Sequence, residues 1–199
     1  MLTIDELKPD VFGPVSLTLE RGTSLVVQGA SGSGKSRFLR AIADLDCSTG
    51  EVSLDGQERS SLEGFEWRRR VRFVAAEAAW WHATARAHFA KPAELDTRLA
   101  ALDLSEKLLD APIDELSTGE RQRLAFLRAL EDQPPVLLLD EPTGALDSGS
   151  TEKMEALFQA ELQRGTILIM VTHDERQAAL FGPPRLLFEA GRATLERAT

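Results

Sequence analysis

The sequence contains one cysteine, no tyrosine and no excess of positive charge. Its 23 lysines and arginines are outnumbered by 32 aspartates and glutamates, so the formal net charge is −9. This balance argues against a nucleic-acid-binding protein, because the phosphate backbone attracts a basic surface. The lone Cys47 cannot form an internal disulfide, which is typical of a cytosolic protein. No apolar run approaches the roughly 18 residues of a membrane-spanning helix, so any role at a membrane is expected to need a partner protein.

The composition is otherwise that of a globular protein. Of 199 residues, 43% are hydrophobic and 28% are charged. Buried strands that alternate with helices predict an α/β core with a parallel sheet. The predicted strands are 15–20, 24–28, 51–54, 71–75, 136–139 and 166–172, the predicted helices are 36–45, 118–131 and 151–164, and a short helix and a hairpin around Gly191 close the chain.

The stretch between the strand at 71–75 and the helix at 118–131 differs in character. Residues 76–116 are rich in alanine and mixed charges, and Glu94–Leu104 has helical periodicity. We interpret this stretch as a small helical insertion. The chain is therefore expected to form one domain over 1–199, with its core at 1–75 and 117–199.

A glycine-rich turn stands between the predicted strand at 24–28 and the predicted helix at 36–45. Its sequence, GASGSGKS, fits the phosphate-binding pattern G-x-x-x-x-G-K-[ST], which requires a strand before it and a helix after it. Glycines let backbone N–H groups face an anion, Lys35 would reach the phosphates, and the Ser36 hydroxyl would bind Mg²⁺. A glycine turn with a chance lysine is the alternative. The predicted nucleotide-binding residues here are Gly29, Ser31, Gly32, Ser33, Gly34, Lys35, Ser36 and Arg37.

Two carboxylates end the apolar run VLLLDE at 136–141. Ligands of open α/β sheets bind at the carboxyl ends of the strands, so Asp140 is expected beside the glycine-rich turn. There Asp140 would hold Mg²⁺ through water, and Glu141 would orient or deprotonate an attacking water. Acids that only cap a turn are the alternative.

The segment LSTGE at 116–120 precedes the predicted helix at 118–131. Ser117 and Glu120 form the S-x-x-E pattern of a capping box, which by itself predicts only a helix start. A capped helix N-terminus also attracts phosphate, so a capping role and a phosphate-binding role are compatible.

The order of these motifs along the chain is specific. The glycine-rich turn, LSTGE, the paired carboxylates, GALD at 144–147 and a histidine after an apolar strand together resemble the ATP-binding cassette ATPase family, over nearly the whole chain. LSTGE resembles the family's signature motif, GALD its D-loop and His173 its H-loop histidine. The signature and D-loop residues are Ser117, Thr118, Gly119, Glu120 and Asp147.

The resemblance implies a P-loop NTPase core with a mixed or parallel sheet, an N-terminal antiparallel β portion and the small helical insertion. It also implies a Mg²⁺-dependent ATPase that sandwiches two ATP molecules in a head-to-tail dimer, either a homodimer or a heterodimer of cassettes. Ser117 and Gly119 would contact the γ-phosphate across the dimer. Glu141 would be the catalytic base, His173 would hold the attacking water, and Asp147 would help to join the two sites.

The function implied by the resemblance is energy coupling. ATP-driven dimerisation would change the conformation of a separate, membrane-embedded transport subunit, from the cytoplasmic, inner face of the cell membrane. No nucleic acid is expected as a partner. The alternative is a soluble ATPase with a nucleotide-dependent regulatory role or an association with nucleic acid.

Three positions depart from the family pattern. Ala76 stands where a glutamine is usual, so either that contact is lost or Glu77 replaces it as a Mg²⁺ ligand; a solvated loop acid is an equal alternative for Glu77. The family usually stacks adenine on an aromatic residue, and Phe12 is the only aromatic residue before the glycine-rich turn. Phe12 either stacks on the base or packs in the core. Thr118 stands where glycine is usual.

Trp80 and Trp81 lie just after this glutamine position, where family members meet the coupling helix of their membrane partner. Adjacent tryptophans are natural interface anchors. Filling the small core of the insertion is an equal alternative.

Overall fold

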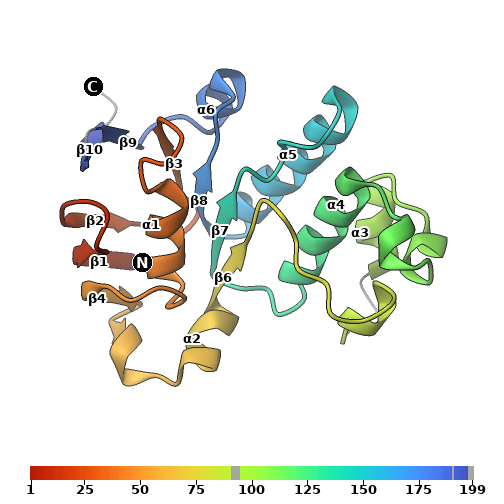
Figure 1. The fold of residues 1–199 in the computed structure, drawn as a ribbon, viewed down its shortest axis with the longest axis horizontal. Helices are drawn as coiled ribbons and strands as arrows, with labels where there is room; N and C mark the ends of the chain where they lie inside the picture. Colours follow the sequence, from red (N-terminus) through yellow and green to blue (C-terminus); the bar gives the residue numbers. More distant parts are fainter. Residues whose placement is uncertain (91–94, 190, 197–199) are drawn as a thin grey trace.

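The computed structural model of the chain describes residues 1–90, 95–189 and 191–196. Two β-sheets form within them, an antiparallel sheet of order β2-β1-β4-β5 and a mixed sheet of order β10-β9-β3-β8-β7-β6 (Figure 1). The strands are β1 (Leu2–Lys8), β2 (Val15–Leu19), β3 (Ser24–Gly29), β4 (Thr49–Leu54), β5 (Gln57–Glu58), β6 (Val71–Val74), β7 (Val136–Asp140), β8 (Ile167–Val171), β9 (Arg185–Glu189) and β10 (Arg192–Glu196). Only β10 pairs antiparallel within the mixed sheet. The predicted α/β fold with an N-terminal antiparallel portion and a mixed sheet is confirmed.

The helices of the described residues cover the mixed sheet on both faces. They are α1 (Lys35–Ile42), α2 (Gly64–Arg70), α3 (Leu95–Ala101), α4 (Thr118–Ala129), α5 (Ser148–Gln163) and α6 (Glu175–Phe181). The buried face of α1 packs in one apolar cluster with both sheets, so α1 lies between them. Helices α4, α5 and α6 contribute to a second cluster on the opposite face. Among the residues described, no helix combines the length and the apolar character needed to cross a lipid bilayer.

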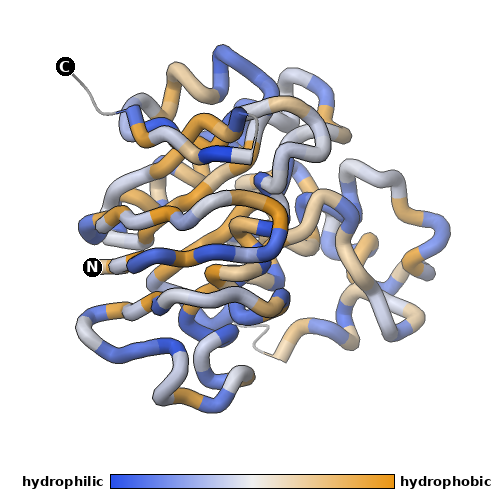
Figure 2. The backbone as a smooth tube through the Cα atoms, turned by 60° about the vertical axis from the view of Figure 1, so that its left-hand side comes forward, coloured by the Kyte–Doolittle hydropathy of each residue, from blue (hydrophilic) through white to orange (hydrophobic). Residues whose placement is uncertain are grey.

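Alternation of side chains along the strands explains the two clusters. Successive residues of a strand point to opposite faces of the sheet. In β3, Val27 belongs to the cluster around α1, whereas Val26 belongs to the cluster around α4 and α5. Every residue of β7 and β8 is buried, which is why these strands read as continuous apolar runs. Figure 2 shows the hydrophobic colour gathering in the interior and the hydrophilic colour on the outer turns.

The sequence analysis missed β1 and α2, as well as the two-residue strand β5. Strand β1 pairs with both β2 and β4, although its polar residues hide the alternation that predicts a strand. Helix α2 is too short for a periodic pattern, and its basic run obscures its one anchor. That anchor is Trp67, which is wholly buried and donates a hydrogen bond from Nε1 to the carbonyl oxygen of Ile42 over 2.8 Å.

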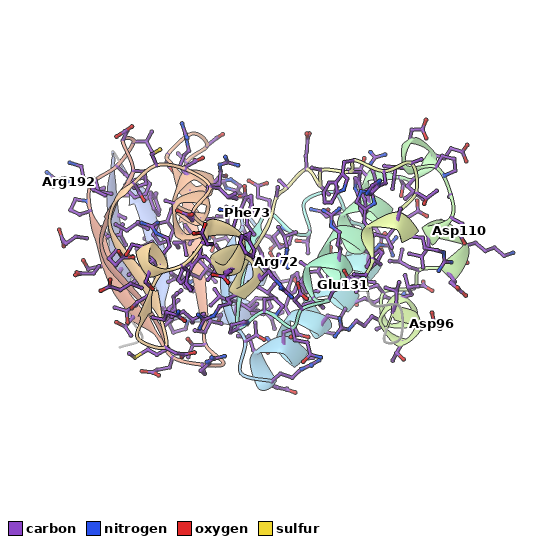
Figure 3. All side chains as sticks on the ribbon, turned by 90° about the horizontal axis from the view of Figure 1, so that it is seen from below. Arg72, Phe73, Asp96, Asp110, Glu131 and Arg192 are labelled. Atoms are coloured by element: carbon purple, nitrogen blue, oxygen red, sulfur yellow. The ribbon has the colours of Figure 1, made fainter. Side chains whose placement is uncertain are left out.

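Residues 76–90 and 95–116 lie beside α4 and are termed here the helical segment (Figure 1). They contain α3 and short 3₁₀ turns, among them Arg86–His88, Glu106–Leu109 and Ile113–Glu115. The periodicity of Glu94–Leu104 corresponds to α3, and Glu94 lies outside the described residues. Figure 3 shows Asp96 and Asp110 at this end of the molecule and Arg192 at the opposite end. The division into a core and a helical subdomain stays a prediction.

Candidate nucleotide-binding site

The glycine-rich turn links the end of β3 to the start of α1. Gly34 caps α1 in the left-handed region, with φ of 106°. A Cβ atom at this position would lie 2.8 Å from Cδ1 of Phe12. Both the backbone conformation and the close contact therefore require glycine directly before Lys35.

The turn holds two buried polar side chains that have no negatively charged partner in the residues that the structure describes. The ammonium group of Lys35 is buried and donates hydrogen bonds to the carbonyl oxygens of Gly29 and Ala30, each over 2.8 Å. Burial lowers the pKa of Lys35, and the nearby carboxylates of Glu141 and Asp140 oppose that effect. The Ser33 hydroxyl is buried and has no hydrogen-bond partner among the described residues. A buried cation and an orphaned hydroxyl on a glycine turn suit an anionic ligand such as a phosphate group.

Asp140 ends β7 beside this turn. Its carboxylate accepts a hydrogen bond from the Ser36 hydroxyl over 3.0 Å, so two of the three predicted metal ligands are brought together. Burial and the neighbouring Glu141 raise the pKa of Asp140, while the Ser36 hydrogen bond lowers it. No cluster of three or more histidine, cysteine or carboxylate side chains suited to a metal occurs in the described part of the chain. One hydroxyl and one carboxylate do fit Mg²⁺, which keeps several waters and shares its remaining ligands with phosphates.

Glu141 and His173 meet at the ends of neighbouring strands. In the parallel register of β7 and β8, Asp140 lies opposite Val171, and the Glu141 N–H donates to the Val171 carbonyl oxygen over 3.0 Å. The Nε2 atom of His173 then lies 3.3 Å from Oε1 of Glu141. Both side chains remain about half exposed, at 50% and 43%, and can still reach a ligand. Glu141 has φ of 47°, a left-handed backbone conformation that is uncommon for a glutamate and that occurs often at functional sites.

The predicted signature segment starts α4 with a capping box. The Ser117 hydroxyl accepts the Glu120 N–H, and the Glu120 carboxylate accepts the Ser117 N–H over 2.8 Å. The Ser117 hydroxyl, which donates to the Glu120 carboxylate over 2.6 Å, and the Ser117 N–H together lower the pKa of Glu120. A Cβ atom on Gly119 would lie 3.1 Å from Cδ2 of Leu146, so the signature segment packs closely against the GALD segment. Thr118 accepts a hydrogen bond from Arg121 over 3.3 Å.

Asp147 caps α5 by accepting the Ser150 N–H over 2.9 Å. This hydrogen bond and one from the Ser150 hydroxyl lower the pKa of Asp147. A cleft of about 490 Å³ runs between this segment and His173, and Glu141, Thr143 and Arg176 also line it. The residues of both predicted catalytic positions thus face one open cleft.

Comparison with known proteins assigns the chain to a family. The model of the family described as ABC transporter matches residues 12–144 of the chain. The chain belongs to the ABC transporter family. The resemblance drawn from the sequence motifs is therefore confirmed.

Individual members of the ABC transporter family match over most of the chain. Aliphatic sulfonates import ATP-binding protein SsuB 1 of Paraburkholderia xenovorans is 37% identical over 94% of this chain and 56% of its own length. Lipoprotein-releasing system ATP-binding protein LolD of Porphyromonas gingivalis is 33% identical over 89% of each chain. The dimeric ATP-binding cassette MJ0796, solved in a post-hydrolysis state bound to ADP and Pi, superposes with a TM-score of 0.85 at 28% identity over 99% of this chain and 98% of its own. The chain spans about half the length of the first curated relatives it matches, 56% and 52%.

The structure shows the surroundings of two residues at which the chain departs from the ABC pattern. Phe12 does not offer a stacking surface, because its ring is 4% exposed and packs edge-on against Phe38 and Phe188. The prediction that it stacks on the base is wrong, and its core alternative holds. Glu77 is exposed in the bend after β6 and makes no ion pair with the described residues. Its part in metal binding stays a prediction.

Arg37, which was predicted to contact the nucleotide, pairs with a carboxylate beside α1. Its guanidinium forms an ion pair with Asp46 over 2.8 Å, and Asp46 also accepts from Arg40 over 2.7 Å. Arg37 remains 58% exposed at the start of α1, where its predicted contact with nucleotide is neither made nor blocked by the ion pair.

Two buried glutamines near the site were missed by the sequence analysis. Gln122 donates a hydrogen bond from Nε2 to the Glu141 carbonyl oxygen over 2.9 Å. Gln177 is wholly buried in α6. The available signal for Gln122 was its place, four residues before Phe126, on the apolar face of a predicted helix. A polar amide buried at such a position is expected to form a hydrogen bond with another buried group.

Proposed function

We propose that the chain binds and hydrolyses ATP with Mg²⁺ as the energy-coupling subunit of a membrane transporter. The observation that supports this best is the meeting of three features at one edge of the mixed sheet. These are the glycine-rich turn, the Ser36–Asp140 pair and the Glu141–His173 pair. Membership of the ABC transporter family and the ADP and Pi bound to the MJ0796 cassette support the same ligand.

Phosphate binding would use the turn as it stands. The Lys35 ammonium group donates its hydrogen bonds to the Gly29 and Ala30 carbonyl oxygens. Phosphate oxygens of ATP would replace these acceptors and would also give the Ser33 hydroxyl a partner. Ser36 and Asp140 would hold Mg²⁺, which when bound neutralises charge on the phosphates.

Hydrolysis would depend on the pair of residues at the ends of β7 and β8. A water attacks the γ-phosphorus, the bond from that phosphorus to the bridging oxygen breaks, and ADP and phosphate leave. Glu141 accepts the proton of the attacking water. His173, whose Nε2 lies 3.3 Å from the Glu141 carboxylate, is placed to orient the same water and to contact the γ-phosphate.

We infer that a second cassette completes the site. The start of α4 presents the capped N-terminus at Ser117 and Gly119, a position suited to a phosphate of a nucleotide bound by the partner cassette. Asp147, which lies between the cleft-lining residues Leu146 and Ser148 in the chain, would connect the two sites. We also infer that residues 1–199 form one domain, with a helical subdomain at 76–116.

The partner in the membrane would dock beside the helical segment. A groove of about 590 Å³ lies between this segment and β6, and Phe73, Trp81 and Arg128 are among its lining residues. Figure 3 shows Arg72 and Phe73 at this junction. The ring of Trp81 is 67% exposed there, as an interface anchor would be. Docking would hold the chain at the inner face of the membrane.

The Glu141→Gln variant tests this proposal. We expect it to retain ATP binding, to lose most of its hydrolysis and to form a dimer in Mg-ATP, measured by light scattering after size-exclusion chromatography. Glu58→Gln, which changes an exposed glutamate outside the site, is the matched control and should hydrolyse ATP like the wild type. Wild-type turnover in Glu141→Gln would remove Glu141 as the base, and a chain that binds no ATP would overturn the proposed function.

A further inference from the structure

A buried charge lies behind the cleft, outside the groups that would touch ATP. Glu155 of α5 is 4% exposed. Its two carboxylate oxygens accept hydrogen bonds from Nη2 of Arg176 over 2.8 and 3.0 Å. Gln177 donates a further hydrogen bond to Oε1 of Glu155 over 3.1 Å. A buried carboxylate with these partners is compensated, and it is costly to strand by removing one of them.

The same amide of Gln177 reaches a third element. Its Nε2 atom also donates to the Thr143 hydroxyl over 3.0 Å. Gln177 has no exposed surface, and its Oε1 atom has no hydrogen-bond partner among the described residues. A buried carbonyl oxygen left unpaired costs stability, so folding alone does not favour a glutamine here.

Each element held by this amide carries one predicted functional residue at its end. Thr143 lies in the turn after Glu141, where the Gly144 N–H donates to the Glu141 carbonyl oxygen over 3.2 Å. Helix α6 begins directly after His173, and its cap Asp174 accepts the Gln177 N–H over 3.2 Å. Helix α5, which carries Glu155, is capped by Asp147.

We propose that Gln177 and Glu155 are positioning residues that hold Glu141 and His173 at their working separation. This inference rests on the proposed ATP hydrolysis and deepens it. The pair touches no substrate and acts through Thr143 and through the start of α6. Misplacing a reacting group by about 1 Å can cost on the order of 100-fold in rate, so small shifts of this framework are enough to matter.

The first test is Gln177→Met, which keeps the length and volume of the side chain and removes both donated hydrogen bonds together with the unpaired oxygen. We expect kcat for ATP hydrolysis to fall roughly 10- to 100-fold, with KM for ATP and the affinity for a fluorescent ATP analogue unchanged. Unchanged kcat would overturn the proposal. An equal loss of affinity and kcat would also overturn it, because that result indicates general damage.

A matched pair of buried glutamates on α5 separates positioning from stability. Glu161 is 6% exposed, accepts from the Thr166 hydroxyl and pairs with Arg164, but it lies at the far end of the helix from the cleft. Glu155→Gln and Glu161→Gln should both lower the free energy of unfolding, measured by urea denaturation. Only Glu155→Gln should lower kcat; equal kcat values for the two variants would contradict the proposal.

Thr143 provides a second route if the Gln177 variant fails to fold. Thr143→Ser keeps the hydroxyl acceptor and should retain more of kcat than Thr143→Val, which removes it at nearly constant volume. Equal kcat in these two variants would overturn the proposal. Loss of activity in Glu141→Gln but not in the Gln177, Glu155 and Thr143 variants would overturn only the positioning role. Wild-type activity in Glu141→Gln would instead contradict the proposed hydrolysis itself.

Discussion

The mixed sheet and the helical segment are built on different principles. Strands β7 and β8 are buried at every position and register directly against each other. The helical segment has short turns, and its ion pairs are exposed: Arg86 is 42% exposed and Asp110 is 61% exposed. The sheet can therefore hold reacting groups at fixed separations, whereas the segment offers side chains to a partner at a small cost in stability.

The predicted functional residues differ between these two regions in the same way. Lys35, Asp140, Glu141 and His173 all lie at the ends of sheet strands or at the helix start beside them. The departures at Ala76 and Glu77 and the exposed Trp81 lie in the helical segment. The predicted chemistry is therefore concentrated where the backbone is most constrained, although the departures at Phe12 and Thr118 lie outside the helical segment.

Two tryptophans provide the largest test of this contrast. Trp67→Ala should lower the free energy of unfolding by about 3–5 kcal/mol, because it empties a fully buried site and leaves the Ile42 carbonyl oxygen without a donor. Trp81→Ala should cost about 1 kcal/mol or less, because its exposed ring loses only surface contacts with Arg128, His82 and His88. Urea denaturation measures both. Equal losses would show that the helical segment is as tightly built as the core.

A change in the glycine-rich turn should come next in size. Lys35→Ala should weaken ATP binding roughly 10- to 100-fold, or about 1.5–3 kcal/mol, because a charged hydrogen-bond donor to the phosphates is lost. Lys153→Ala, which removes an exposed pair with Asp103, is the matched control and should bind as the wild type does. Isothermal titration calorimetry distinguishes them. Unchanged affinity in Lys35→Ala would contradict the assignment of the phosphate site.

Substitutions in the exposed helical segment should affect binding of the membrane subunit rather than stability. Trp81→Ala should weaken the affinity for the membrane subunit by about 2 kcal/mol, roughly 30-fold, which is measured by co-purification. ATP hydrolysis by the isolated chain should stay unchanged. Phe65→Ala, another exposed apolar side chain that lies outside the groove, serves as the control. Retained binding in Trp81→Ala would remove the groove as the docking site.

The smallest expected effect concerns acid stability. Hydrogen bonds from Arg40 and Arg37 lower the pKa of Asp46. The unfolded state therefore binds the proton more tightly, so the stabilisation is full above about pH 4 and is lost as the pH falls through the lowered pKa. Asp46→Asn should cost less than about 1 kcal/mol at neutral pH, and that difference should vanish toward pH 2.

The exposed pair in the helical segment serves as the comparison for this acid effect. Lys153 lowers the pKa of Asp103, but solvent and salt screen an exposed pair. In thermal unfolding at 0.15 M salt, Asp103→Asn should therefore change less with pH than Asp46→Asn does. The reverse order would contradict the contrast between the two regions.

Local patterns in the sequence determined the α/β class and predicted the phosphate loop, the paired carboxylates and the signature segment. These features depend on spacing within a few residues or on continuous apolar runs, and both are visible without neighbours. The mixed sheet and the N-terminal antiparallel portion followed from the resemblance to the family. Helix α2 and the burial of Trp67 were not visible, because short elements carry too few residues for a periodic signal.

Other properties were decided only by tertiary structure. Whether Phe12 stacks or packs depended on Phe38 and Phe188, which come from elements far along the chain. The same is true of the amide of Gln177, which joins α5, α6 and the turn after Glu141. A side chain's partners depend on which strands lie next to each other in the sheet, and strand order arises from long-range pairing that no local pattern encodes.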